Sequence, residues 1–451
     1  MANFAKSNVP RFAVEVYQNE YLPDGGREVN AVVTVTSTGG GTTGGAAAHG
    51  YVPGGGPDAA VAIMVDCSGS MDYPPLKMRA AREATAAAID ALRDGVRFAV
   101  IGGTHEAKEV YPGDGELAVA DAHTRERAKR ALRGLTAGGG TAIGTWLRLA
   151  DRLLNTADLP DSAVRHGILL TDGRNEHESP EDLAAALEAC AGRFTCDARG
   201  VGTDWEVKEV TQIASSMLGS ADIVADPVAL AADFTHMMET AMGKEIADVA
   251  LRLWTPMGAE IKFVKQVAPT VEDLTERRTQ AGPRAGDYPT GSWGDESRDY
   301  HVCVEVPNAE IGQEMLAARV SLVIDRGDGS PQTLSHGLVR AVWTDDMAAS
   351  TSINPQVAHY TGQAELAQVI QQGLDARKSG DTYGATAKLG RAVQLAAGSG
   401  NSDTAKLLAK VVDVVDAATG TVRLKAKVEE ADEMTLETRS TKTVRVKNVK
   451  K

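Results

Sequence analysis

The most constraining feature of this chain is the stretch Asp66-Cys67-Ser68-Gly69-Ser70, which directly follows the apolar run from Ala59 to Val65. A short apolar run bounded by turn residues predicts a buried β-strand. One carboxylate and two hydroxyls then follow on a tight turn, at spacings of two and four residues. Hard oxygen donors of this kind suit Mg²⁺, Mn²⁺ or Ca²⁺ rather than zinc or copper.

Two later segments carry the same kind of side chain. Gly138-Gly139-Gly140-Thr141 is a flexible loop that ends in a hydroxyl, and the apolar run from Ile168 to Leu170 is followed by Thr171 and Asp172. From 57 to 244 predicted strands alternate with amphipathic helices, which indicates a doubly wound, mostly parallel sheet. Ligands of such sheets bind beyond the carboxyl ends of the strands. We therefore expect Asp66 and Asp172 to lie at the same edge.

Taken together, Asp66-x-Ser68-x-Ser70, then Thr141, then Asp172 resembles the metal-ion-dependent adhesion site (MIDAS) of the von Willebrand factor A (VWA) family. The resemblance implies a Rossmann-like α/β VWA domain in a bacterial cytoplasmic protein. It also implies that these residues hold Mg²⁺, or Mn²⁺ or Ca²⁺. Because Mg²⁺ is octahedral, five protein groups leave at least one position open. In the family that position accepts a Glu or Asp from a partner protein.

A second interpretation of the same motif stays open. Asp-x-Ser-x-Ser can be a plain turn that caps the following helix, with Asp66 and Ser68 accepting backbone N–H groups. In that case the motif would have a structural role only.

Charge and cysteine usage narrow the classes of function. The net charge is −14, which argues against nucleic acid as the main partner, because binding phosphates requires a basic surface. The four cysteines are scattered without metal-ligand spacing, and we expect free buried thiols. No stretch reaches the roughly 18 apolar residues of a membrane span, and no signal-peptide core is present. We expect a cytoplasmic protein that is not inserted in a membrane.

The pattern of apolar and polar residues changes along the sequence and predicts five regions. Alternating segments within 1–45 and 245–345 predict an antiparallel β-sandwich, and 57–244 is the predicted VWA domain. The simplest arrangement inserts the VWA domain into the sandwich, since the ends of a compact α/β domain often lie close together. Region 353–433 is predicted to be helical, and 434–451 to be a disordered basic tail rich in threonine.

The tail suggests a second hypothesis, of a different class. Basic residues flank several threonines, as in substrates of basophilic Ser/Thr kinases. The candidate phosphorylation sites are Thr438, Thr441 and Thr443. A phosphothreonine there would be a ligand for a forkhead-associated domain. This hypothesis places the chain in Ser/Thr kinase signalling.

Catalysis has weaker support in the sequence. The chain has no Gly-x-Ser-x-Gly elbow and no Gly-x-x-x-x-Gly-Lys-Ser/Thr phosphate loop. We predict that the protein is not an enzyme but an adaptor or scaffold. The enzyme alternative is a metal-dependent phosphohydrolase, which would need a second metal or a general base that the sequence does not identify.

Overall fold

The computed structural model describes residues 10–38, 58–156, 159–325 and 330–446. The chain divides into two compact units. The first, here called the inserted unit, comprises 58–248 and 291–295. The second, the host unit, comprises 11–38, 249–290 and 296–446. Because the segments of the host unit flank the inserted unit in sequence, the chain has the insertion architecture that the sequence predicts.

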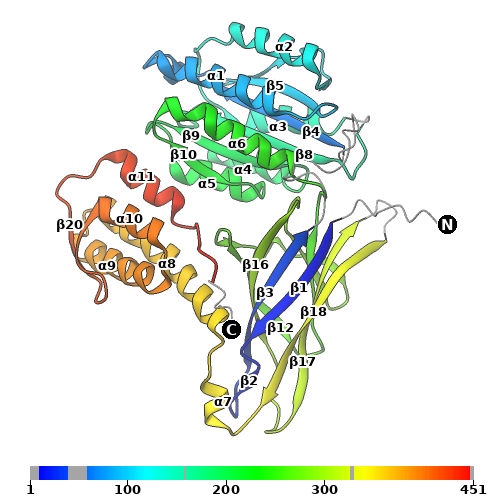
Figure 1. The fold of residues 1–451 in the computed structure, drawn as a ribbon, viewed down its shortest axis with the longest axis vertical. Coiled ribbons are helices and arrows are strands. Elements are labelled where there is room, and N and C mark those ends of the chain that lie inside the picture. Colours follow the sequence, from blue (N-terminus) through cyan, green and yellow to red (C-terminus); the bar gives the residue numbers. More distant parts are fainter. Residues whose placement is uncertain (1–9, 39–57, 157–158, 326–329, 447–451) are drawn as a thin grey trace, which may run out of the picture. The chain divides into compact units, whose positions relative to one another are not determined.

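The inserted unit alternates strands and helices along the chain (Figure 1). Its strands are β4 (Ala59–Asp66), β5 (Arg97–Gly103), β6 (Ala107–Tyr111), β7 (Ala118–Val119), β8 (Val164–Thr171), β9 (Thr195–Val201) and β10 (Ala221–Val224). Its α-helices are α1 (Leu76–Ala91), α2 (Ala122–Ala131), α3 (Ile143–Leu154), α4 (Pro180–Cys190), α5 (Val207–Ser216) and α6 (Leu230–Met242). Short 3-10 helices are η1 (Gly69–Asp72), η2 (Leu132–Gly134) and η3 (Pro227–Ala229).

These strands form one sheet in the order β10-β9-β8-β4-β5-β6, with β7 also paired to β5. The pairings among β10, β9, β8, β4 and β5 are parallel, whereas β6 and β7 are antiparallel to β5. Every residue of β4 is buried, as expected for a strand whose two faces are both covered by helices. The α/β class with a mostly parallel sheet is therefore confirmed.

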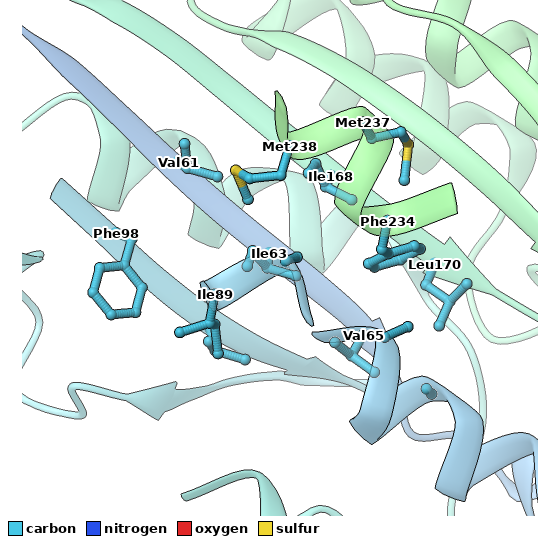
Figure 2. Close-up of a cluster of buried hydrophobic side chains, with 14 of the residues drawn as sticks. Val61, Ile63, Val65, Ile89, Phe98, Ile168, Leu170, Phe234, Met237 and Met238 are labelled. Atoms are coloured by element: carbon cyan, nitrogen blue, oxygen red, sulfur yellow. The ribbon is translucent and has the colours of Figure 1, made fainter. Parts of the chain in front are cut away.

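A dense apolar core fixes β4 against one helical layer (Figure 2). Alternate residues of β4 point to this layer, because side chains of a strand alternate between its faces. They pack with side chains from β5, β8, α1 and α6. The residues labelled in Figure 2 are Val61, Ile63, Val65, Ile89, Phe98, Ile168, Leu170, Phe234, Met237 and Met238. This packing holds the carboxyl ends of β4 and β8 in fixed register.

The host unit contains two largely antiparallel sheets, of five strands in the order β1-β3-β16-β12-β13 and six in the order β14-β15-β11-β17-β18-β2. The strands from the start of the chain are β1 (Arg11–Gln18), β2 (Tyr21–Leu22) and β3 (Glu28–Thr38). Those that follow the inserted unit are β11 (Ala250–Trp254), β12 (Glu260–Ala268), β13 (Glu272–Asp273), β14 (Thr279–Gly282), β15 (Ala285–Pro289), β16 (Glu296–Glu305), β17 (Glu314–Asp325) and β18 (Pro331–Trp343), with the 3-10 helix η4 at Thr275–Arg277. Strand β3 pairs with β16 from Glu28 to Ser37, so the two sequence segments complete one sheet.

The C-terminal part of the host unit is helical with one exception. Its helices are α7 (Met347–Thr351), α8 (Pro355–Lys378), α9 (Thr382–Ser399), α10 (Ser402–Val411) and α11 (Glu430–Arg439). The exception is a hairpin of β19 (Val412–Asp416) and β20 (Thr421–Leu424), where the sequence pattern predicted that the helix continues. The run Val411-Val412-Asp413-Val414-Val415 explains the difference, because β-branched residues favour strands over helices.

The expectation of a disordered tail is wrong for the described residues. Helix α11 starts with Glu430, Asp432 and Glu433, which are favourable near a helix N-terminus, and it buries Met434 and Leu436. Residues 441–446 then run along the sandwich, where the Val271 N–H donates to the Thr441 carbonyl at 2.8 Å. Residues 447–451 lie outside the described part of the chain.

Candidate metal centre

The first three candidate ligands lie at the end of β4 and on the loop that follows it. Asp66 is the last residue of β4 and is fully buried. Its Oδ1 accepts the Ser68 N–H at 2.7 Å, and its Oδ2 accepts the Thr171 hydroxyl at 2.7 Å. The hydroxyl oxygens of Ser68 and Ser70 are 2.8 Å apart. The bond from Ser68 to Asp66 is one that a plain turn would make, but the Ser68 hydroxyl caps no helix.

The second carboxylate arrives from the neighbouring strand. Strands β4 and β8 are parallel, with Val65 opposite Leu170, so their carboxyl ends meet. Asp172 directly follows β8 and is fully buried. The Ser70 hydroxyl donates to Asp172 Oδ1 at 2.7 Å. The structure therefore brings the loops after β4 and β8 together, as the sequence predicts.

Thr141 completes the set from a third loop, and Gly173 shows where the hydroxyls converge. A methyl carbon added to Gly173 would lie 2.9 Å from Ser70 Oγ, 3.5 Å from Thr141 Oγ1 and 3.7 Å from Ser68 Oγ. Three hydroxyl oxygens from two loops thus surround one point, which glycine leaves clear of side-chain atoms. Asp66 and Asp172 are joined to these hydroxyl-bearing residues by hydrogen bonds, Asp66 with the Ser68 N–H and Asp172 with the Ser70 hydroxyl.

The glycine-rich loop is fixed to the loop after β4 by backbone hydrogen bonds. The Gly69 N–H donates to the Gly139 carbonyl at 2.9 Å, and the Gly138 N–H donates to the Cys67 carbonyl at 2.8 Å. The Thr141 N–H donates to His177 Nδ1 at 3.2 Å, so that ring nitrogen carries no proton and Nε2 is the donor of the neutral ring. These bonds place the Thr141 hydroxyl in a fixed position.

The surroundings of Asp66 disfavour its ionised form. Burial, and to a lesser extent the charge of Asp172, raise the pKa of its carboxyl to about 6, against the opposing effect of hydrogen bonds from Ser68 and Thr171. Two carboxylates held out of water at one place are unfavourable unless a positive charge compensates them. These two carboxylates therefore favour a positive charge beside them.

One compensating charge is Lys77, which the sequence analysis missed. Its side chain is 5% exposed, and its Nζ lies 2.8 Å from Asp172 Oδ2 and 2.9 Å from Asp204 Oδ2. Burial lowers the pKa of Lys77, but the hydrogen bonds to both carboxylates outweigh burial and raise it. A signal was present in the sequence, because Lys77 lies four residues before Ala81 on the buried stripe of α1, which holds no other charged residue.

Two further residues position α3 directly after Thr141. Asn175 Oδ1 accepts the Ile143 N–H at 2.8 Å, and Glu178 Oε1 accepts the Gly144 N–H at 2.7 Å. The side chain of Asn175 also donates to Glu178 at 2.7 Å. Only the folded chain reveals these roles, since neither residue belongs to a local motif.

The donor set fits a hard divalent cation. Two carboxylates and three hydroxyls offer oxygen only, which is the chemistry that Mg²⁺, Mn²⁺ and Ca²⁺ prefer. Cys67 lies beside the set, but its Sγ contacts the Val65 carbonyl at 3.5 Å, and burial raises the pKa of this thiol to about 12. Among the described residues no group of three or more His, Cys, Asp or Glu side chains is arranged for metal binding.

The candidate phosphorylation sites occupy a different environment from the one expected. Thr438 is buried on α11, and its hydroxyl donates to the Met434 carbonyl at 2.7 Å. The Thr443 hydroxyl donates to the Val267 carbonyl at 2.7 Å, and Thr441 is half-buried. A kinase would first have to detach this segment from the host unit.

All four cysteines are buried and free, as predicted.

The doubly wound sheet, with carboxyl and hydroxyl side chains on the loops after two adjacent strands, defines a VWA-type domain. Comparison with known proteins supports this class. A family model described as von Willebrand factor type A domain matches residues 59–223, and one described as its C-terminal domain matches 394–440. Domains of this type typically act in protein–protein interaction.

This chain belongs to the von Willebrand factor type A family. It is 52% identical to a von Willebrand factor type A protein from Catenulispora acidiphila, over 98% of this chain and 99% of that one, with a TM-score of 0.90. The ArnB paralog VWA2 from Sulfolobus acidocaldarius, at 12% identity, shares the fold over 95% of this chain and 98% of that one, with a TM-score of 0.58. No curated protein is similar enough to count as a relative.

The expectation about membranes can be compared with the helices themselves. No helix in the described part of the chain combines the length and the apolar character that crossing a bilayer requires.

Proposed function

We propose that this chain is a non-enzymatic interaction module whose metal site binds an acidic side chain of a partner protein. Asp66, Ser68, Ser70, Thr141 and Asp172 would hold Mg²⁺, or Mn²⁺ or Ca²⁺ in its place. The metal, when bound, would supply a Lewis-acidic position for one carboxylate oxygen of the partner. The proposal includes no catalytic step.

The observation that carries the proposal is the oxygen-lined point beside Gly173. Three hydroxyl oxygens lie 2.9–3.7 Å from the position of a methyl carbon on that residue, and both carboxylates belong to the same hydrogen-bonded cluster. A capping turn would need only Asp66 and Ser68. It would give no reason for Thr141 and Asp172 to join them from other loops.

The charges of the buried side chains explain why the ligand from the partner protein would be an acidic side chain. Asp66 and Asp172 are both buried, and Lys77, which Asp172 shares with the exposed Asp204, offsets part of their charge. The buried negative charge around the metal would therefore be smaller than that of two carboxylates, against two positive charges on the metal. The remaining positive charge, in surroundings of low dielectric constant, favours an anionic ligand over water.

Metal binding by the purified full chain tests the site. We expect Mg²⁺ binding in isothermal titration calorimetry, and we expect Asp66→Asn and Thr141→Val to abolish or strongly weaken it. Thr85→Val is the matched control, because Thr85 is a buried threonine of α1 whose hydroxyl donates to the Ala81 carbonyl away from the site. Equal Mg²⁺ affinity in the two threonine variants would contradict the assignment.

The absence of catalysis needs its own test. Incubation of the protein with Mg²⁺ and generic phosphomonoesters and phosphodiesters should release no phosphate or alcohol above background. Turnover that the wild-type chain supports and Asp66→Asn abolishes would replace the interaction proposal with the metal-dependent phosphohydrolase.

A further inference from the structure

An exposed apolar segment adjoins the candidate metal centre. Residues 73–76 read Tyr73-Pro74-Pro75-Leu76 and connect η1 to α1; all four are exposed. Tyr73 is 82% exposed and Leu76 is 45% exposed. Large apolar side chains grouped on a surface beside a functional site are typical of protein contact surfaces. We call residues 73–76 the apolar rim.

The apolar rim is held by the site residues at both ends. The Tyr73 N–H donates to the Ser70 carbonyl at 3.3 Å, and the Lys77 N–H donates to the Pro74 carbonyl at 2.9 Å. Lys77 is in turn held by Asp172 at 2.8 Å. Since two prolines also restrict the backbone between these anchors, little conformational freedom is left to lose when a partner binds.

The other charges near the site restrict which partners fit. Asp72 is exposed at the start of the apolar rim. Asp204 is 68% exposed, and its Oδ2 lies 2.9 Å from Lys77 Nζ. These carboxylates repel further anions, whereas the proposed metal position accepts one. A run of acidic residues would therefore meet repulsion from Asp72 and Asp204.

We propose that the partner presents a single Asp or Glu next to a bulky apolar side chain, and not an acidic run. The carboxylate would occupy the open metal position, and the apolar neighbour would pack on Tyr73 and Leu76. This inference rests on the proposed function, because it assigns the surroundings of the same site. It adds a specificity surface that belongs to this chain's own residues.

Peptide selection on the purified full chain tests the inference. The probe is a phage-displayed library of nonapeptides with Asp fixed at the centre and all other positions random. Binding takes place in Mg²⁺, and only phage released by EDTA are sequenced. We expect Phe, Trp, Leu or Met beside the Asp and a depletion of second acids.

Variants then separate the apolar rim from the metal. Tyr73→Ser should weaken binding of a selected synthetic peptide about tenfold, which is the effect of losing one well-packed apolar contact, and should leave Mg²⁺ affinity unchanged. The matched control is Tyr383→Ser on α9, since Tyr383 is 87% exposed in the host unit. The control should bind the peptide as the wild type does.

Each other result has a defined meaning. Selected peptides rich in second acids, or equal binding by Tyr73→Ser and Tyr383→Ser, would overturn the apolar-rim proposal alone. Absence of Mg²⁺ binding by the wild-type chain would overturn the proposed function and this inference with it. A Mg²⁺-dependent dimer in analytical ultracentrifugation that Tyr73→Ser abolishes would show that a second copy occupies the rim, which would also refute the proposal.

Discussion

Replacement of Lys77 by methionine should make the stability of the inserted unit depend on metal. The change removes an ammonium group with a side chain 5% exposed and leaves Asp172 Oδ2 buried without its cation. Removal of one partner from a buried ion pair typically costs 3–5 kcal/mol. We take about 3 kcal/mol, the lower end of that range, because Ser70 still donates to Asp172 Oδ1 and water can serve the exposed Asp204.

The assay is thermal unfolding of the wild type and Lys77→Met in EDTA and in saturating Mg²⁺. For a unit of this size, about 3 kcal/mol corresponds to a loss of about 6–12 °C in EDTA. In Mg²⁺ the loss should shrink, because a bound cation compensates Asp172 and binding to the folded state alone stabilises it. The difference in melting temperature between Mg²⁺ and EDTA should therefore be larger in the variant than in the wild type.

Lys378→Met is the matched control. Lys378 Nζ lies 2.7 Å from the carboxylate of Glu437, whose side chain is 2% exposed, in the host unit far from the site in sequence. Its loss should destabilise the host unit equally in EDTA and Mg²⁺. If Lys77→Met lowers stability by the same amount in both conditions, the ammonium does not share Asp172 with a metal, and the reasoning fails.

Three further predictions concern the effect of pH on metal binding, the effect of pH on stability, and the space beside Gly173. Because burial raises the pKa of Asp66 to about 6, protons should compete with Mg²⁺ and lower its affinity progressively below pH 6 in calorimetry; a flat profile from pH 7 to 5 would contradict this. Burial lowers the pKa of His301 to about 4, so the unfolded state binds more protons than the folded state between about pH 6.5 and 4. The free energy of unfolding of the host unit should therefore fall as pH falls through that window. In chemical unfolding, His301→Gln should make this dependence of stability on pH weaker. Gly173→Ala should abolish Mg²⁺ binding, since its methyl would lie 2.9 Å from Ser70 Oγ, whereas Gly138→Ala, with open space around it, should bind normally.

Much of the site could be predicted because its signals are local. Asp66 and Asp172 each follow an apolar run, and parallel strands bring their carboxyl ends to one edge without further information. Thr141 follows a glycine-rich loop in the same way. The alternation of strands and helices along the chain also predicts the fold class, because it requires no contact between distant residues to be known.

Other roles depend on partners distant in sequence, which no local pattern specifies. The Lys77 ammonium pairs with Asp172 and Asp204, which are distant in sequence. The sequence around Lys77 therefore shows only a charged residue among the buried positions of a helix. The end segment gives a second case. Arg445 lies 3.0 Å from buried Asp299, and Val446 packs in a cluster with Val32. Its composition alone suggested disorder, and its order comes from the host unit.

The split of the host unit between distant segments has a consequence for how the chain is made. Strand β3 hydrogen-bonds to β16, which the ribosome synthesises more than two hundred residues later. During that interval residues 58–248 can fold as a unit, because domains generally fold as units during synthesis. Strand β3 can pair with β1 at once, but its other edge stays unpaired until β16 is made, and such edges promote aggregation. We therefore expect this edge to need protection until β16 has been synthesised.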